Sequence, residues 1–264
     1  MTIHKGAATF SISEATGAGP QRPGDVASQT ARAFIGVREL LLRGEFGRGE
    51  RISELPLVAR LGMSRTPIRL ALERLAHMGL LDFGSTGGFS VREFTIADVR
   101  DSIELRGTLE GTAARLAAER LVDDGELVVL RRRRDEMEAM SALSIDSFAH
   151  YMDLNESFHA IILGLAKSPM LSRLLDQANS LPFASPSAMV FPTSVMAASD
   201  ETLAIAQEHH RALVEAIQNR EGARAEHLGR EHARLARRVF ELSLSDSDVL
   251  SRVPGGALIN VSVR

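Results

Sequence analysis

The chain has 264 residues, of which 44% are hydrophobic, 25% charged and 5% aromatic, and its formal net charge is −3. It contains no cysteine, which excludes disulfides, thiolate nucleophiles and cysteine-ligated zinc. No apolar run reaches the ~20 residues that cross a bilayer, and the N-terminus lacks the continuous apolar core of a signal peptide. The sequence therefore predicts a soluble, cytoplasmic chain with no membrane partner, folded as one large domain or two ordinary ones.

The positive charge is unevenly distributed along the chain. Whereas the whole chain is acidic, the stretch from residue 32 to residue 74 carries nine arginines and five acidic residues. A locally basic stretch in an acidic chain is typical of a DNA-reading part joined to a part that does not bind DNA. The nine arginines are Arg32, Arg38, Arg43, Arg48, Arg51, Arg60, Arg65, Arg69 and Arg74.

The N-terminal quarter predicts two helices after an irregular tail. Residues 1–25 are rich in Gly, Ala, Ser, Thr and Pro without any period, which predicts a disordered tail. A helix is predicted over residues 26–46, where apolar residues recur on one face. A second helix is predicted over Ser53–Leu61, because Ser53 is a favourable N-cap and Gly62 is typical of the residue that follows a helix.

A third helix and a hairpin follow. Ser64 is predicted to cap the third helix, which tolerates Pro67 in its first turn and ends at Gly79. The sequence LLDFGSTGGFSVREF at residues 80–94 predicts a small β-hairpin with a glycine-rich tip. This order of elements predicts a winged helix-turn-helix over residues 26–94. The buried stripe of the third helix is predicted at Ile68, Leu72 and Leu75.

The start of the third helix carries side chains suited to DNA. Arg65 and Arg69 are four residues apart, so they share a face and can each contact a guanine or a phosphate. Thr66 can donate to a phosphate, and the helix N-terminus at Ser64 attracts one. Gly88 at the hairpin tip allows close approach to the DNA backbone. The alternative is an ordinary amphipathic helix with surface arginines beside a hairpin.

Residues 57–91, LVARLGMSRTPIRLALERLAHMGLLDFGSTGGFSV, closely resemble the DNA-binding domain of the GntR family. The resemblance extends over about residues 28–94, and LGMSRTPIR nearly reproduces the family's Leu-Gly-Val-Ser-Arg-Thr-Pro-Val-Arg. It implies that the side chains of Arg65, Thr66 and Arg69 and the wing glycine Gly88 contact DNA.

This chain departs from the GntR pattern at two positions. Leu55 stands where some members of the family carry another DNA-contacting arginine, which puts that contact in doubt. Leu70 replaces the usual glutamate after Arg69, which is expected to change operator preference.

The rest of the chain predicts an all-α bundle over residues 95–244 and a loose C-terminal tail over residues 245–264. A long loop rich in Pro and Ser is predicted over residues 183–199, and such loops are often functional. The Arg run at residues 131–134 is expected to be a solvated helix face paired with nearby acids. Helices are predicted at about 95–121, 124–141, 145–166, 168–182, 200–220 and 221–244.

Three histidines lie on apolar faces of separate predicted helices: His159, His210 and His232. Asn155 is one turn before His159 on the same face. Inward-facing ligands from separate helices form the metal sites of helical bundles, whereas a single such histidine is usually a satisfied core residue. The spacing leaves both interpretations open, and it also leaves His209 as a rival to His210.

Residues 95–242 resemble the FCD ligand-binding domain of FadR-like GntR regulators, through ELRGTLEGTAARLAA, NESFHAII, EHHRALVEAI and the 22-residue gap from His210 to His232. The resemblance implies a divalent metal ion, zinc or nickel, bound by Asn155, His159, His210 and His232. Many members carry Asp where this chain has Asn155. A neutral ligand set leaves the charge of the cation uncompensated, so an anionic effector can supply the missing charge.

Arg106 matches an arginine that often faces the effector pocket of the FCD domain. Our hypothesis is that Arg106 pairs with an effector carboxylate. The alternative is a surface or interhelical salt bridge with Glu110, four residues later.

Together these features predict a homodimeric transcription repressor and not an enzyme. It would bind palindromic double-stranded operator DNA and be controlled by a small carboxylate effector at or near the metal. Two alternatives stay open. A metal-dependent hydrolase is disfavoured by the absence of an HExxH motif. A purely structural metal would leave a constitutive DNA binder.

Overall fold

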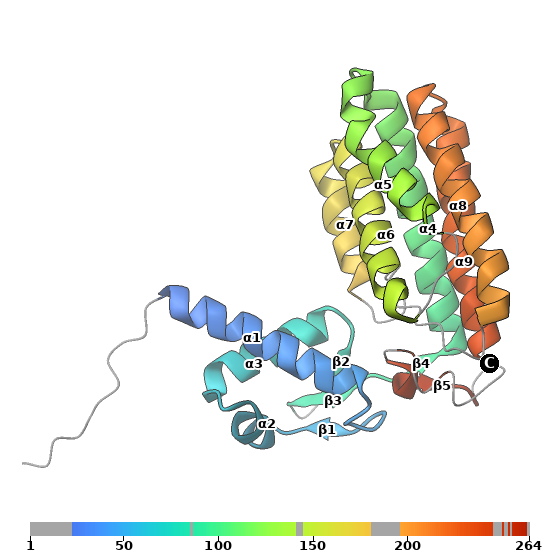
Figure 1. Ribbon diagram of the computed structural model, residues 1–264. Coiled ribbons are helices and arrows are strands. Elements are labelled where there is room, and N and C mark those ends of the chain that lie inside the picture. The colour runs from blue at the N-terminus through green and yellow to red at the C-terminus, as the bar shows by residue number, and fades with distance from the viewer. Residues whose placement is uncertain are drawn as a thin grey trace, which may run out of the picture.

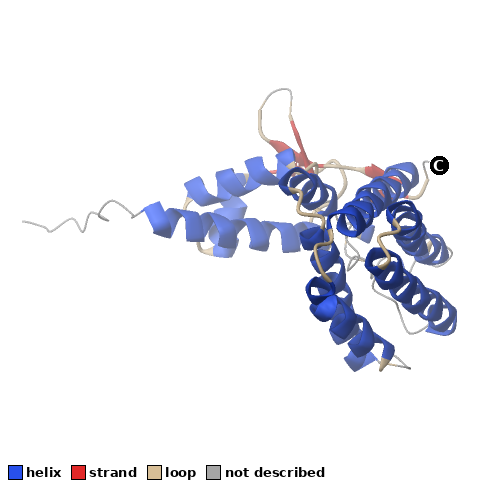
Figure 2. Cartoon of the chain, turned by 90° about the horizontal axis from the view of Figure 1, so that it is seen from above, coloured by secondary structure: helices blue, strands red, loops and turns tan. Residues whose placement is uncertain are grey.

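The computed structural model is mainly α-helical, as predicted, with a small helical head beside a longer bundle (Figure 1). The few strands gather in the head and at its junction with the bundle (Figure 2). Residues 1–22 of the predicted tail and residues 183–195 of the predicted loop lie outside the described residues. The structure describes residues 23–84, 87–140, 145–180, 196–244, 250, 253 and 255–262.

The head is a three-helix winged helix-turn-helix. Its helices are α1 (Pro23–Leu42), α2 (Glu54–Leu61) and α3 (Arg65–His77), close to the predicted ranges. The predicted hairpin forms as β2 (Leu81–Phe83) and β3 (Phe89–Val91), with Leu81 opposite Val91. The two-residue strand β1 (Arg51–Ile52), too short to show a period, pairs antiparallel with β3 and completes the sheet order β1-β3-β2.

The turn between α2 and α3 has local causes. Gly62 has a φ of +62°, a conformation that favours glycine, and its N–H donates to the carbonyl of Val58. Ser64 is extended at the N-cap position of α3, and its hydroxyl makes no capping hydrogen bond. Pro67 is buried in the first turn of α3, where it breaks no helical hydrogen bond. The predicted stripe is confirmed at 0% exposure for Ile68, Leu72 and Leu75.

The bundle runs from α4 to α9, roughly as predicted. A capping box between Thr95 and Asp98 starts α4. The helix predicted from residue 124 begins as a 3-10 turn, η1, before α5, and α8 begins four residues earlier than predicted, at Met196. The elements are α4 (Ile96–Arg120), η1 (Asp124–Leu127), α5 (Val128–Glu138), α6 (Ile145–Leu165), α7 (Pro169–Asn179), α8 (Met196–Gln218) and α9 (Gly222–Ser243).

Helices α4 and α9 pack backbone against backbone. A Cβ built on Gly111 of α4 would lie 2.6 Å from the carbonyl oxygen of Glu226, and one on Gly229 of α9 would lie 2.9 Å from the Cα of Gly111. Real Cβ atoms do not approach other atoms this closely, so any side chain at Gly111 or Gly229 would force α4 and α9 apart. These glycines set the spacing of the two helices that carry Arg106 and His232.

This packing gives a paired stability prediction. Gly111→Ala is expected to lower the free energy of unfolding by about 1–3 kcal/mol through overpacking. Gly164→Ala, on α6 where no described atom lies within 4 Å of the added methyl, is expected to raise it by about 0.5–1 kcal/mol through helix propensity. Urea denaturation of both variants measures the difference. Equal stability of the two variants would contradict the close packing of α4 on α9.

The C-terminal segment does not match the loose tail expected from the sequence. It folds as a 3-10 turn, η4 (Gly256–Leu258), and a strand, β5 (Ile259–Asn260). Strand β5 pairs parallel with β4 (Phe94–Thr95), the connection between the head and α4. The prediction of a loose tail is therefore wrong for these residues, which are drawn in red between the head and the lower end of the bundle in Figure 1.

Candidate DNA interface and metal centre

The N-terminal half of α3 presents the predicted DNA-reading side chains to solvent. Arg65, Thr66 and Arg69 are exposed, while the opposite face of the helix is buried in the head. The Nε of Arg69 lies 3.2 Å from Oε1 of Glu73, and the arginine side chain is 67% exposed. An exposed pair of this kind contributes little to stability, so the guanidinium can exchange its partner at small cost.

The wing carries the predicted glycine. Gly87 and Gly88 are exposed and have φ values of +86° and +88°. The guanidinium of Arg51 on β1 donates a 3.0 Å hydrogen bond to the carbonyl of Gly87, which supports the wing from the neighbouring strand. Sequence reasoning missed this role, because the bond depends on a pairing 36 residues away along the chain. Leu55 and Leu70, the two departures from the GntR pattern, are 56% and 41% exposed.

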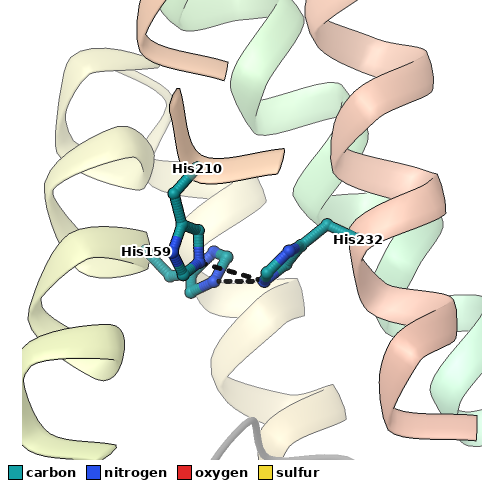
Figure 3. A group of neighbouring side chains, drawn as sticks. All are labelled: His159, His210 and His232. Carbon is teal, nitrogen blue, oxygen red and sulfur yellow. Dashed lines mark hydrogen bonds between the residues drawn. The ribbon is translucent and has the colours of Figure 1, made fainter. Parts of the chain in front are cut away.

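The three predicted histidines meet inside the bundle (Figure 3). His159 comes from α6, His210 from α8 and His232 from α9. The Nε2 atom of His232 lies 3.2 Å from Nε2 of His159 and 3.3 Å from Nε2 of His210. Within the described part of the chain, this is the one group of His and acidic residues with a metal-binding geometry.

The donor set fits a metal ion. Two nitrogens that bind zinc tetrahedrally at about 2.0–2.1 Å are separated by about 3.3 Å, which matches both Nε2 distances. The Nδ1 atoms of His210 and His232 are buried and have no hydrogen-bond partner among the described residues. A cation held by the Nε2 lone pairs would fix the ring protons on Nδ1.

The other predicted residues near the cluster are placed as follows. Asn155 is buried, one turn before His159 on α6. His209 does not belong to the cluster, and its ring centroid lies 5.9 Å from that of His232, so His210 is the α8 member. His227, also on α9, is exposed, with Nδ1 2.7 Å from the carbonyl oxygen of Ala223.

Arg106 forms the salt bridge with Glu110 that the sequence left as an alternative, but the pair is buried. The two side chains are 3% and 7% exposed, and the Nε–Oε1 distance is 3.7 Å. Glu110 lines a small cavity together with His159, and both charges act on that histidine. Sequence reasoning missed Glu110 as a member of the site, although its i+4 spacing from Arg106 was the available signal.

The Arg run at residues 131–134 is paired with acids, as expected for a solvated helix face. Arg131 pairs with Asp124 at 3.4 Å, and Arg132 pairs with Glu136 at 3.9 Å. Arg134 lies 3.8 Å from Glu138. These pairs account for the run without a nucleic-acid partner.

Burial lowers the pKa of all three clustered histidines. The pKa of His159 is lowered by desolvation, partly opposed by the charge of Glu110. The pKa values of His210 and His232 lie well below the ordinary value, because desolvation is reinforced by the neighbouring imidazoles. The cluster is therefore neutral at pH 7, the protonation state that binds metal.

The lowered pKa values predict a pH-dependent stability of the metal-free protein. The unfolded chain, with ordinary histidine pKa values near 6.5, binds more protons than the folded chain below about pH 7. The free energy of unfolding is therefore expected to fall as the pH is lowered from about 7.5 to 5.5, above the range in which acidic groups titrate. Urea denaturation in EDTA measures this slope, which should be shallower in His210→Gln. An identical slope in His210→Gln would contradict a lowered pKa of His210 in the folded chain.

A winged helix-turn-helix joined to an all-α bundle is an architecture of bacterial transcriptional regulators. Residues 30–91 match the model of the bacterial regulatory proteins of the gntR family, and residues 101–235, half of the chain, match the FCD domain. The chain belongs to the GntR family of bacterial regulators that carry an FCD domain. No described helix is long and apolar enough to cross a membrane.

Three comparisons illustrate the relationship. The chain is 32% identical to a probable D-xylose utilization operon transcriptional repressor of Paenarthrobacter nicotinovorans, over 78% of this chain and 85% of that one. It is 31% identical to the uncharacterized HTH-type transcriptional regulator YdhC of Bacillus subtilis, over 55% of this chain and 64% of that one. The fold resembles that of E. coli McbR/YncC, with a TM-score of 0.57 at 20% identity over 81% of this chain and 98% of that one. These relatives give the hydrolase alternative no support.

Proposed function

We propose that this chain is a DNA-binding transcription repressor whose operator affinity is set by a small ligand in the bundle. The observation that carries the proposal is the exposed surface of Arg65, Thr66 and Arg69 at the start of α3, on a helix whose other face is buried in the head. A helix anchored on one side and cationic on the other can enter a major groove N-terminus first. Ser64 and Gly88 extend the same interface to the backbone phosphates.

The DNA partner is a palindromic double-stranded operator bound by a homodimer. Two copies of α3 would meet successive major-groove faces about one helical turn, roughly 34 Å, apart. Guanidinium groups at Arg65 and Arg69 suit guanine edges or phosphates. The exposed Leu70 is an apolar side chain on the same helix, and it suits a thymine methyl better than the glutamate usual at this position.

The ligand partner is a small carboxylate bound beside a divalent metal ion, zinc or nickel. His159, His210 and His232 would hold the ion, with the amide oxygen of Asn155 as a fourth ligand. All four ligands are neutral, so an anion in an open coordination position would balance the charge. Arg106, buried beside the cluster, would pair with the carboxylate and would exchange the long contact with Glu110 for it.

Binding to the DNA upstream of its own gene tests the first half of this proposal. The purified chain is mixed with that fragment and with a shuffled fragment of the same composition, at a fixed salt concentration near 0.15 M. We expect the authentic fragment to bind at least about 10³-fold more tightly, with a footprint of two half-sites. Equal binding to the two fragments would contradict a sequence-specific regulator of its own gene.

Thermal unfolding tests the second half. A panel of mono- and dicarboxylates is added to the zinc-loaded protein, and a specific effector at about 100 times its Kd should stabilise the fold by about 2.7 kcal/mol. The same panel on Arg106→Gln should give no shift. A shift of equal size in that variant would exclude Arg106 as the carboxylate partner.

A further inference from the structure

The C-terminal segment, residues 255–260, lies outside both matched regions, which end at residues 91 and 235. It is nevertheless buried. Leu258 and Ile259 are 0% and 3% exposed and belong to the hydrophobic cluster that includes the core of the head. Burying two such side chains is a favourable interaction that a solvated tail would not make. The segment is therefore an integral part of the fold.

The segment is also held by polar contacts at three places in the head. The N–H of Gly255 donates a 3.0 Å hydrogen bond to the carbonyl of Leu42 at the end of α1. The guanidinium of Arg48 donates a 2.8 Å hydrogen bond to the carbonyl of Ile259. Asn260 donates a side-chain hydrogen bond to Glu93. These contacts involve the end of α1, the loop that follows α1, and the C-terminal end of the head's sequence.

The parallel pair of β5 and β4 places the segment on the connection between the head and the bundle. Phe94 of β4 is the register partner of Ile259, and α4 begins two residues later, at Ile96. A connection of residues 92–95 alone would leave several backbone torsions free to reorient the head. Pairing with β5 and burial of Phe94 remove that freedom.

The same core contains residues of the bundle. Ile103 of α4 and Val239 and Phe240 of α9 pack in one cluster with Leu258 and Ile259. On α9, Val239 lies seven residues, or about 10 Å along the helix axis, beyond the metal-cluster member His232. One rigid helix thus joins the histidine cluster to the core in which the C-terminal segment is buried.

We propose that residues 255–260 are a positioning element for DNA binding, which fixes the head in one orientation relative to α4 and α9. With the segment in place, a displacement of α9 at the histidine cluster moves the head as a unit. Without it, the head would turn about the connection at residues 92–95, and the two copies of α3 in a dimer would lose their fixed spacing. The DNA-binding part of this inference rests on the proposed function, and the orientation part does not.

Distance measurements between two spin labels test the orientation part. Because the natural chain has no cysteine, Ala59→Cys on α2 and Val128→Cys on α5, both exposed, provide unique labelling sites. The labelled full-length chain is diluted with unlabelled protein, so that only distances within one copy are recorded. We expect a narrow distance distribution that becomes at least twofold broader in Ile259→Asp and stays narrow in Ile259→Val. Val261→Asp, two residues further on and 49% exposed in the unsubstituted chain, is the matched control and should leave it narrow.

Operator binding distinguishes a positioning role of the segment from a merely structural one. Ile259→Asp should bind the operator at least tenfold more weakly, while its zinc affinity and helical circular dichroism stay unchanged. The proposal is overturned if Ile259→Asp folds and its distance distribution is not broader. It is also overturned if the distribution is broader but the operator affinity is unchanged. If Ile259→Asp does not fold, Arg48→Ala decides in its place, because among the described residues the side-chain hydrogen bond that this variant removes is the one to Ile259. Broadening in Arg48→Ala supports the proposal, and an unchanged distribution overturns it.

If the unsubstituted chain binds no operator, the proposed function fails, while the distance distributions still decide the orientation.

Discussion

Replacing both Arg65 and Arg69 by alanine is expected to weaken operator binding by about 30-fold or more, with the fold unchanged. Each arginine that contacts a base is worth about 1–3 kcal/mol, and every 1.4 kcal/mol is a factor of ten. Both side chains are exposed, and the ion pair of Arg69 with Glu73 lies at the surface, so their loss costs little stability. Gel-shift titration on the operator, with a denaturation curve for each variant, measures the two effects.

The matched control for this prediction is Arg132→Ala. Arg132 lies on α5 in the bundle and its side chain is 61% exposed, so its loss removes a similar surface charge away from α3. Operator affinity should stay within about twofold, because Arg132 lies on α5 and outside the proposed DNA-contacting surface of α3. If Arg132→Ala weakened binding as much as the double variant, net charge rather than the α3 surface would explain the binding.

Asn155→Asp is expected to raise zinc affinity by about tenfold or more, and His159→Ala to lower it by more than about 10²-fold. The first change adds a negative charge to a set of neutral ligands, and an added attraction of about 1.4 kcal/mol already gives a factor of ten. The second removes a ligand, which should cost more than the 10- to 100-fold that loss of an outer partner costs. Competition with a chromophoric chelator at pH 7.5 gives both affinities.

His227→Ala is the control for the metal prediction, because His227 is an exposed histidine on the same helix as His232. It should leave zinc affinity unchanged. Equal zinc binding by the unsubstituted chain and by His159→Ala would contradict a metal centre at the three histidines. A lower affinity in Asn155→Asp would show that position 155 is not a ligand.

The head could be predicted from the sequence because its signals are local. Gly62, Ser64 and Pro67 determine the turn and the start of α3 within six residues, and Ile68 and Leu72 show its buried face by their spacing. The same holds for the histidines. The helical spacing places each histidine on an apolar face. The family resemblance predicted that the three bind one metal ion, and in the structure their ligand nitrogens lie within reach of one ion.

The C-terminal segment and Glu110 could not be predicted in the same way. Strand β5 has only two residues, and Ile259 pairs with Phe94 of β4, which lies far away along the chain, so no local pattern reveals the pairing. In the sequence, Glu110 is simply the i+4 partner of Arg106, a common spacing for an exposed ion pair. Its burial depends on the glycines of α4 and α9, which bring the two helices into contact. Both features arise from tertiary packing between distant parts of the chain.

The most direct test of the account is the operator affinity of the zinc-loaded chain, measured at one salt concentration with and without the carboxylate that raises its melting temperature most. We expect the affinity to fall by about 5- to 150-fold with the ligand, the range of a typical coupling free energy. By linkage, operator DNA should lower the affinity for the carboxylate by the same factor. An operator affinity that stays the same while the carboxylate binds and stabilises the bundle would contradict control of the head by the histidine-bearing domain.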